Sequence, residues 1–214
     1  MTNYSLTLGN VTKYFGRRLV FSGMNASFES GNVCGISGPN GSGKSTIVKI
    51  IANIISPTRG KVLHKADDKT IEEEKLHDYI GFVSPYLFLY DEFSAEENLI
   101  HISNIRGKKF DKQRSDFLFN QFNLFDRRKD IVRGYSSGMK QRLKYIFALL
   151  HQPQLIILDE PTSNLDNPGK DIVYKMIGDE GKNNLVLVAS NDDPDLKLCS
   201  QILFVEDFKT NNKN

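Results

Sequence analysis

The chain has 214 residues, with 28 Lys and Arg residues against 26 Asp and Glu residues. Its hydrophobic fraction of 39% and charged fraction of 25% are typical of a folded globular protein rather than a disordered one. The net charge of +2 gives no electrostatic reason to expect nucleic acid as a partner. No apolar run approaches the ~20 residues of a membrane span, no signal peptide is evident, and Cys34 and Cys199 lack CxxC spacing. These features favour a cytoplasmic protein with reduced cysteines in its core.

Strands and one helix are predicted in the first part of the chain. Residues 4–8 and 21–28 alternate polar and apolar side chains, as half-buried strands do. Residues 33–37 form a short strand that leads directly into a glycine-rich turn. Isoleucines at positions 47, 50, 51 and 54 predict a helix that Pro57 and Gly60 end. The densely charged stretch 65–78 indicates a solvated surface.

The pattern changes from about residue 85 to residue 150 and then returns to strands. Phe117, Leu118, Phe122 and Phe125 indicate packed helices, and another helix follows Ser136. Strand signals resume at 155–158, 185–189 and 202–205, and Pro168 opens a helix between the first two. The sequence therefore predicts a single α/β domain. Its core covers about residues 1–84 and 151–214, and a helical subdomain covers about residues 85–150.

A phosphate-binding loop is indicated by the pattern G-x-x-x-x-G-K-[ST], placed after a strand and before a helix. Its residues are Gly38, Pro39, Asn40, Gly41, Ser42, Gly43, Lys44, Ser45 and Thr46. In such a loop, backbone N–H groups and a helix N-terminus surround an anion. Lys44 would reach the β- and γ-phosphates, and the Ser45 hydroxyl would coordinate Mg²⁺. The alternative is an ordinary Gly/Ser turn, which the strand–helix context disfavours.

A second motif is the apolar strand 155–158, which ends in Asp159 and Glu160. Consecutive residues at a strand end point in different directions. Asp159 can therefore reach the Mg²⁺ shell while Glu160 faces an attacking water. The alternative is a solvated strand terminus, which is common for an isolated pair of carboxylates.

Residues 135–139, Tyr-Ser-Ser-Gly-Met, resemble the LSGGQ signature motif of ATP-binding cassette (ABC) proteins. Ser136 and Gly138 are kept, while Tyr135, Ser137 and Met139 replace the other consensus residues. The backbone and hydroxyl groups of Ser136, Ser137 and Gly138 suit a γ-phosphate at a second helix N-terminus. Taken alone, Ser136 would be an ordinary helix N-cap.

Other segments match the same family in the right order. Phe15 stands where the family stacks an aromatic ring on adenine, with Tyr14 as the alternative. Residues 56–60 resemble the turn after the family's P-loop helix, and residues 160–166 resemble its D-loop region, with Asp166 at a dimer seam. The resemblance covers nearly the whole chain and is to one nucleotide-binding subunit of an ABC transporter. It implies a P-loop NTPase fold, with a RecA-like core, N-terminal antiparallel strands and an inserted ABC-type helical subdomain.

Two positions depart from the family pattern. Pro85 stands where the family has a glutamine that contacts Mg²⁺ and the nucleophilic water, and proline offers no such ligand. Asn191 replaces the switch histidine; it can donate a hydrogen bond to phosphate but cannot titrate near neutrality. We therefore expect Lys44, Glu160 and Asn191 to be the catalytic residues, and we expect hydrolysis to be slow. The histidines elsewhere are expected to be surface residues: His64, His77, His101 and His151.

The resemblance implies a hydrolysis of MgATP at an interface between two subunits stacked head to tail. The P-loop of one chain would face residues 136–138 of the other, in a homodimer or in a heterodimer with another ATP-binding subunit. A separate integral membrane permease would carry the solute, and this chain would lie on the inner face of the cell membrane. The short length and the signature variant resemble the ATPases of drug, haem or polysaccharide exporters. Two alternatives remain: an ATP-dependent clamp or sensor with little hydrolysis, and a soluble ABC ATPase not linked to transport.

Overall fold

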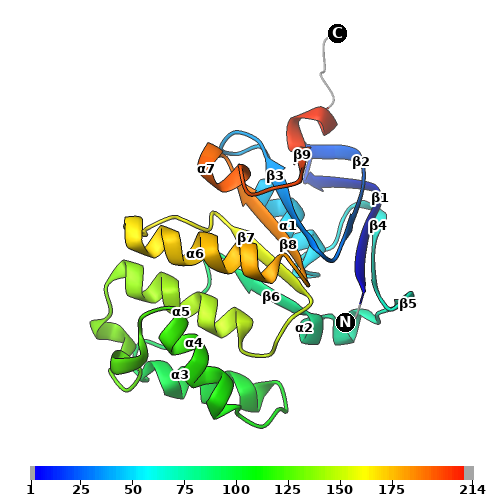
Figure 1. Ribbon diagram of the computed structural model, residues 1–214. Coiled ribbons are helices and arrows are strands. Elements are labelled where there is room, and N and C mark those ends of the chain that lie inside the picture. The colour runs from blue at the N-terminus through cyan, green and yellow to red at the C-terminus, as the bar shows by residue number, and fades with distance from the viewer. Residues whose placement is uncertain (1–2, 210–214) are drawn as a thin grey trace.

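The computed structural model describes residues 3–209, and two sheets with helices between and beside them make up the molecule (Figure 1). A parallel sheet has the strand order β6-β7-β8-β3-β9, and an antiparallel sheet has the order β2-β1-β4-β5. The parallel strands are β3 (Asn32–Ser37), β6 (Ile80–Val83), β7 (Leu155–Asp159), β8 (Leu185–Ser190) and β9 (Gln201–Phe204). The antiparallel strands are β1 (Tyr4–Phe15), β2 (Arg18–Glu29), β4 (Arg59–Ala66) and β5 (Lys69–Thr70). The predicted α/β class with N-terminal antiparallel strands is confirmed.

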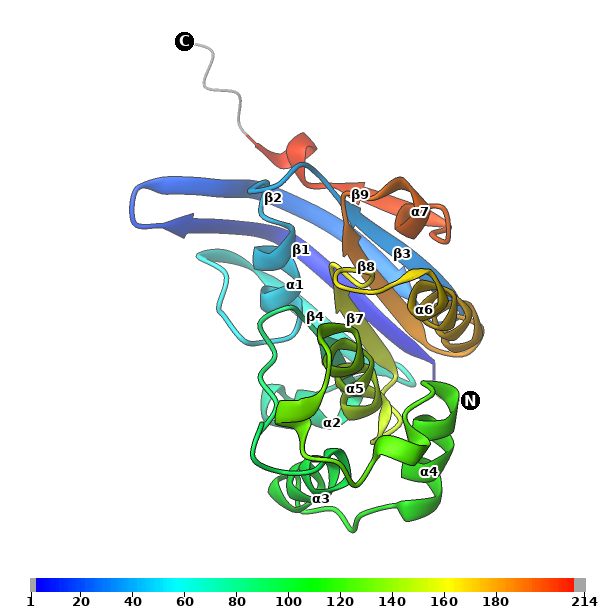
Figure 2. The same ribbon diagram turned by 90° about the vertical axis from the view of Figure 1, so that its left-hand side faces the viewer.

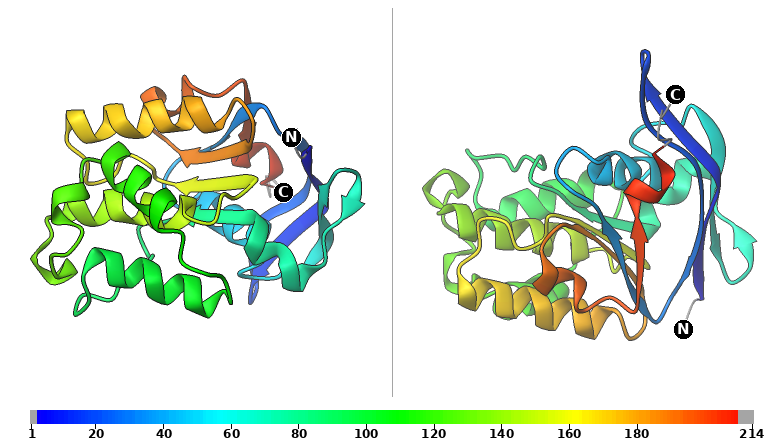
Figure 3. Two further views of the ribbon diagram at one scale, coloured as in Figure 1. Left: turned by 60° about the horizontal axis from the view of Figure 1, so that its bottom comes forward. Right: turned by 90° about the horizontal axis from the view of Figure 1, so that it is seen from above.

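Helices cover both faces of the parallel sheet. Helix α1 lies between the two sheets, whereas α5 and α6 cover the opposite face, with α3 and α4 farther out (Figures 2 and 3). The helices are α1 (Lys44–Ile51), α2 (Leu76–Tyr79), α3 (Ala95–Ile105), α4 (Lys112–Gln121), α5 (Ser137–Leu149), α6 (Asn167–Glu180) and α7 (Asp193–Leu196). Helices α3, α4 and α5 therefore occur between the neighbouring strands β6 and β7.

The central strands are buried on both faces, so they separate two hydrophobic cores. In β7, Leu155 and Ile157 pack with α1 and the antiparallel sheet, whereas Ile156 and Leu158 pack with the helices of the other face. This alternation follows from the two-residue period of side chains in a strand. It also explains why residues 155–158 form a continuous apolar run rather than an alternating one.

The first helix ends earlier than its isoleucine pattern predicts. Helix α1 stops at Ile51, and the side chain of Ile54 is 56% exposed. The physical reason is the backbone of Asn53, which has a φ of 57° in the left-handed region. The N–H of Ile54 then donates to the carbonyl of Lys49 at 2.8 Å, which closes the helix well before Pro57.

Two further sequence-based expectations need correction. Phe117, expected in the packing of the helical region, is 57% exposed, because α4 turns its Leu118 side to the core. His64, on β4 and expected at the surface, is 4% exposed. Its Nδ1 shares a hydrogen bond of 2.6 Å with the hydroxyl of Tyr4. This neutral partner suits an uncharged imidazole.

This burial predicts a specific loss of stability in acid. Desolvation lowers the pKa of His64 from 6.5 to about 4. Between pH 6.5 and pH 4, the imidazole therefore binds a proton in the unfolded chain but not in the folded one. The contribution of His64 to the free energy of unfolding is full above pH 6.5 and decreases as the pH drops. The expected loss from this residue is about 3 kcal/mol at pH 4 and below.

Urea unfolding of the wild type and of His64→Gln between pH 7 and pH 4 measures this effect. Glutamine keeps a carbonyl oxygen for Tyr4 and cannot titrate, so the acid-dependent loss should be smaller in the variant. Burial also lowers the pKa of His151 to about 4. His151→Gln should therefore remove a further part of the slope of the unfolding free energy against pH. Identical slopes in all three proteins would show that neither imidazole is buried in the neutral form.

Candidate functional site

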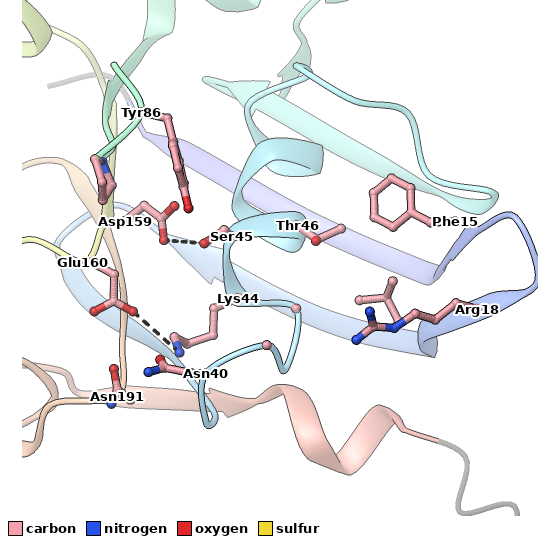
Figure 4. A pocket seen from close by; sticks show the side chains of 14 residues that line it. Phe15, Arg18, Asn40, Lys44, Ser45, Thr46, Tyr86, Asp159, Glu160 and Asn191 are labelled. Atoms are coloured by element: carbon pink, nitrogen blue, oxygen red, sulfur yellow. Dashed lines mark hydrogen bonds and ion pairs between the residues drawn. The ribbon is translucent and has the colours of Figure 1, made fainter. Parts of the chain in front are cut away.

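A cleft of about 570 Å³ opens where the P-loop, the β1–β2 hairpin and the carboxyl ends of β7 and β8 meet (Figure 4). A crevice at the carboxyl ends of parallel strands is the usual ligand position in such sheets. Most of the residues singled out in the sequence line it: Phe15, Asn40, Gly41, Gly43, Lys44, Ser45, Thr46, Asp159, Glu160 and Asn191. Gly38, Pro39 and Ser42 belong to the same loop but do not line the cleft.

The loop that precedes α1 requires glycine for a steric reason. Gly43 has a φ of 114°, and a Cβ atom there would lie 2.6 Å from Cγ1 of Val20. With glycine at this position, the chain can turn directly into the helix that begins at Lys44. The first hydrogen bonds at this end are donated by the N–H groups of Thr46 and Ile47, both to the carbonyl of Gly43. The N–H groups of Lys44 and Ser45 precede them at the edge of the cleft, which makes the loop suited to an anion.

Lys44 is held in the cleft by oxygen atoms from two parts of the chain. Its Nζ donates to the carbonyl of Gly38 at 2.8 Å and lies 3.6 Å from Oε1 of Glu160. The side chain is only 5% exposed. A buried ammonium with carbonyl and carboxylate partners is already positioned to meet an anionic group in the same cleft.

Ser45 and Asp159 form a pair whose chemistry fits a small divalent cation. The Ser45 hydroxyl donates to Oδ1 of Asp159 at 3.0 Å, and the other carboxylate oxygen, Oδ2, is buried without a hydrogen-bond partner. An orphaned buried carboxylate oxygen is costly, which points to an additional ligand. In residues 3–209, no group of three His, Cys, Asp or Glu side chains could hold a metal by itself. The pair fits Mg²⁺, which commonly takes one or two carboxylates together with phosphate oxygens.

Glu160 adopts a backbone conformation that is unusual for its residue type. Its φ is 52°, in the left-handed region, and its N–H donates to the carbonyl of Ala189 on β8 at 2.9 Å. Strained residues of this kind concentrate at functional sites. Burial raises the pKa of the Glu160 carboxyl, and Lys44 opposes that shift. Burial likewise raises the pKa of Asp159, against the effect of Ser45.

The far rim of the cleft carries an exposed aromatic ring and a basic side chain. Phe15 is 54% exposed, and the Lys13 Nζ lies 4.9 Å from the centre of its ring. Arg18 lies opposite Phe15 in the β1–β2 hairpin and also lines the cleft. Neither Arg18 nor Val20 was predicted from the sequence as a site residue. The available signal was the two-residue turn at Gly16, which pairs Phe15 with Arg18 and so brings both to one rim.

Both positions that depart from the family pattern lie at this cleft. Pro85 and Asn191 are among its lining residues. Tyr86, which the sequence analysis also missed as a site residue, lies at the same edge with its hydroxyl toward Ser45 and Asp159 (Figure 4). The Lys49 ammonium lies over its ring, with Nζ 5.0 Å from the ring centre. Tyr86 therefore lies next to Pro85, the residue that stands where the family has a glutamine.

Four other predicted residues do not line this cleft either and lie at the starts of helices elsewhere. Ser136 caps α5, its hydroxyl accepting the N–H of Met139 at 3.2 Å, and Ser137 and Gly138 form the first residues of that helix. Asp166 caps α6 by accepting the N–H of Gly169 at 3.0 Å. The two helix starts are close together, because a Cβ atom on Gly138 would lie 3.4 Å from the carbonyl oxygen of Asn164.

Comparisons with known proteins agree with this arrangement. A family model described as "ABC transporter" matches residues 21–163. The chain is 29% identical over 179 residues to the daunorubicin resistance ATP-binding protein DrrA3 of Streptomyces coeruleorubidus, covering 83% of this chain and 57% of that protein. It is 28% identical to the lipoprotein-releasing system ATP-binding protein LolD of Leptospira interrogans, covering 95% and 90%. A solved structure titled as a putative ABC transporter ATP-binding protein from Pyrococcus furiosus superposes with a TM-score of 0.81 at 23% identity, covering 96% of this chain and 100% of that one. The chain spans little more than half the length of the drug-resistance relative.

Proposed function

This chain belongs to the ABC transporter family, and on that premise we propose that it binds and hydrolyses MgATP to power transport through a separate membrane protein. The observation that supports this most directly is the Ser45–Asp159 pair beside Lys44 and the P-loop. Phosphates would lie on the N–H groups of the loop and of α1, with Lys44 neutralising charge on the β- and γ-phosphates. The exposed ring of Phe15 at the rim would stack on the adenine.

Ser45 and Asp159 would hold the Mg²⁺ ion, which supplies charge neutralisation at the phosphates when bound. Glu160 would accept a hydrogen bond from the attacking water and orient it toward the γ-phosphorus. Burial raises the pKa of the Glu160 carboxyl, which makes its carboxylate a better proton acceptor than that of an ordinary glutamate. Asn191 would donate its side-chain amide to the γ-phosphate.

A second subunit is part of the proposal because residues 136–138 do not reach this chain's own cleft. If they bind a γ-phosphate, the phosphate must belong to a nucleotide held by another chain. Two copies stacked head to tail would supply each cleft with the α5 N-terminus of the partner, and Asp166 would lie at the seam. A homodimer and a heterodimer with another ATP-binding subunit both satisfy this arrangement.

Transport is proposed from the family and from the functions for which its relatives are named. No helix in the described part of the chain is long and apolar enough to cross a bilayer. By its family, we propose that an integral membrane permease carries the solute, with this chain bound at the inner face of the cell membrane. The relatives named for drug resistance and for lipoprotein release favour an export direction for the proposed transport.

Isothermal titration with ATP and Mg²⁺, followed by steady-state phosphate release, tests the proposed activity. Lys44→Met should weaken binding by more than about tenfold and abolish release, because a charge-assisted contact to phosphate is lost. Lys61→Met is the matched control, since Lys61 is exposed on β4 and does not line the cleft. Equal affinity for ATP in the two variants would contradict nucleotide binding at this loop.

A further inference from the structure

Asp195, on α7, is a buried carboxylate that the proposed reaction does not use. Its side chain is 1% exposed, and no Lys, Arg or His of residues 3–209 forms an ion pair with it. Three hydroxyl groups donate to it instead. Burying a carboxylate without a cation is unfavourable in free energy, so other groups must stabilise its charge.

Two of these hydroxyl groups come from the segments that carry the proposed catalytic side chains. Thr162, two residues after Glu160, donates to Oδ1 at 3.1 Å. Ser190, immediately before Asn191, donates to Oδ2 at 2.7 Å. A third donor, Tyr174 on α6, reaches Oδ1 at 3.0 Å. An ionised carboxylate only accepts hydrogen bonds, so it can hold several hydroxyl donors at once.

We infer that Asp195 is a positioning residue that fixes Glu160 and Asn191 relative to each other by joining the segments that bear them. The inference rests on the proposed ATPase function of those two residues. The turn that contains Glu160 has a left-handed backbone, and such a conformation persists only when neighbouring contacts hold it. Thr162 supplies one of these contacts through Asp195, and Tyr145 supplies another by donating to the carbonyl of Pro161 at 2.6 Å.

The same network continues to the residue after Asn191. The Ser190 hydroxyl that donates to Asp195 also accepts the N–H of Asp192 at 3.0 Å. The backbone on both sides of Asn191 is therefore tied to one carboxylate. Loss of a bond in this chain would move reacting groups without removing any of them, and a displacement of about 1 Å can cost up to about a hundredfold in rate.

Thr162→Val and Tyr174→Phe form a matched pair that tests the inference. Each removes one hydroxyl donor from the same oxygen of Asp195, but only Thr162 belongs to the Glu160 turn. Thr162→Val should lower kcat for ATP by between about tenfold and a hundredfold with KM unchanged. Tyr174→Phe should keep the wild-type kcat, and Thr162→Ser, which restores the hydroxyl, should recover most of the rate.

A second measurement does not depend on hydrolysis. Hydrogen exchange of the Glu160 amide in nucleotide-free protein should quicken in Thr162→Val and stay at the wild-type rate in Tyr174→Phe, because that amide links the turn to Ala189 on the neighbouring strand β8. Equal effects of the two variants on kcat and on exchange, or no effect of either, would overturn the inference. A wild type that does not hydrolyse ATP would count against the proposed function instead, and the exchange result would still decide the role of Asp195.

Discussion

Glu160→Gln should reduce steady-state phosphate release by about 10²–10⁴-fold, because glutamine cannot accept the proton that leaves the attacking water. ATP binding should be preserved, since Lys44, Ser45 and Asp159 remain in place. With hydrolysis blocked, each nucleotide would stay between the P-loop of one chain and the α5 N-terminus of another. We therefore expect the variant with MgATP to run as a stable dimer in size-exclusion chromatography with light scattering.

The same variant reports on the ionisation of Glu160. Because burial raises the pKa of this carboxyl, the acid limb of the wild-type rate should lie at higher pH than an ordinary glutamate would give. The rate should fall as the pH drops toward that pKa, since the protonated form cannot act as a base. Glu160→Gln should lack this limb. A variant that stays monomeric at saturating MgATP in the presence of its natural partner subunit would contradict the stacked arrangement.

Asn191→His should raise the rate of phosphate release, because it restores a side chain that can stabilise charge on the γ-phosphate. Pro85→Gln should raise it independently, by restoring a polar ligand in the same cleft. A preorganised polar contact of this kind is worth about 10²–10³ in rate, or about 2.7–4 kcal/mol. Affinity for MgATP should change little. Steady-state phosphate release at saturating ATP measures both effects.

Asn191→Ala and Pro85→Ala are the matched controls for these gains. Asn191→Ala should slow the reaction further if the amide already donates to phosphate, whereas Pro85→Ala should leave the rate near that of the wild type. In the wild type, no inflection near pH 6.5 should trace to position 191, because asparagine does not titrate. A wild-type enzyme that turns over tens of ATP molecules per second, unchanged by either reversion, would show that other groups such as Tyr86 supply the missing contacts.

Much of the fold followed from local patterns in the sequence. The P-loop was predictable because its glycines, its lysine and the preceding strand 33–37 are adjacent in the chain. The carboxylate pair at 159–160 was predictable because a continuous apolar run marks a strand buried on both faces. The helices after Ser136 and around Pro168 begin close to where their capping residues indicate, because a helix cap is also a local signal.

The features that escaped prediction depend on contacts between distant segments. Arg18 and Tyr86 reach the cleft through a hairpin turn and through a loop after β6, and neither position carries a motif of its own. The burial of His64 arises from its pairing with Tyr4 on a different strand, 60 residues away. The early end of α1 depends on the backbone of Asn53, which apolar periodicity does not report.

The strand order also has a consequence for synthesis of the protein on the ribosome. Strand β3, which leads into the P-loop, has β8 and β9 as its two neighbours. About 150 residues separate β3 from β8, so at roughly 5–20 residues per second the apolar strand waits on the order of ten seconds or more for a partner. The β1–β2 hairpin can form at once, because Phe15 pairs with Arg18. A nascent chain thus acquires the edge of its nucleotide cleft long before the sheet that supports it, and it would depend on chaperones to shield β3 until Phe204 has emerged.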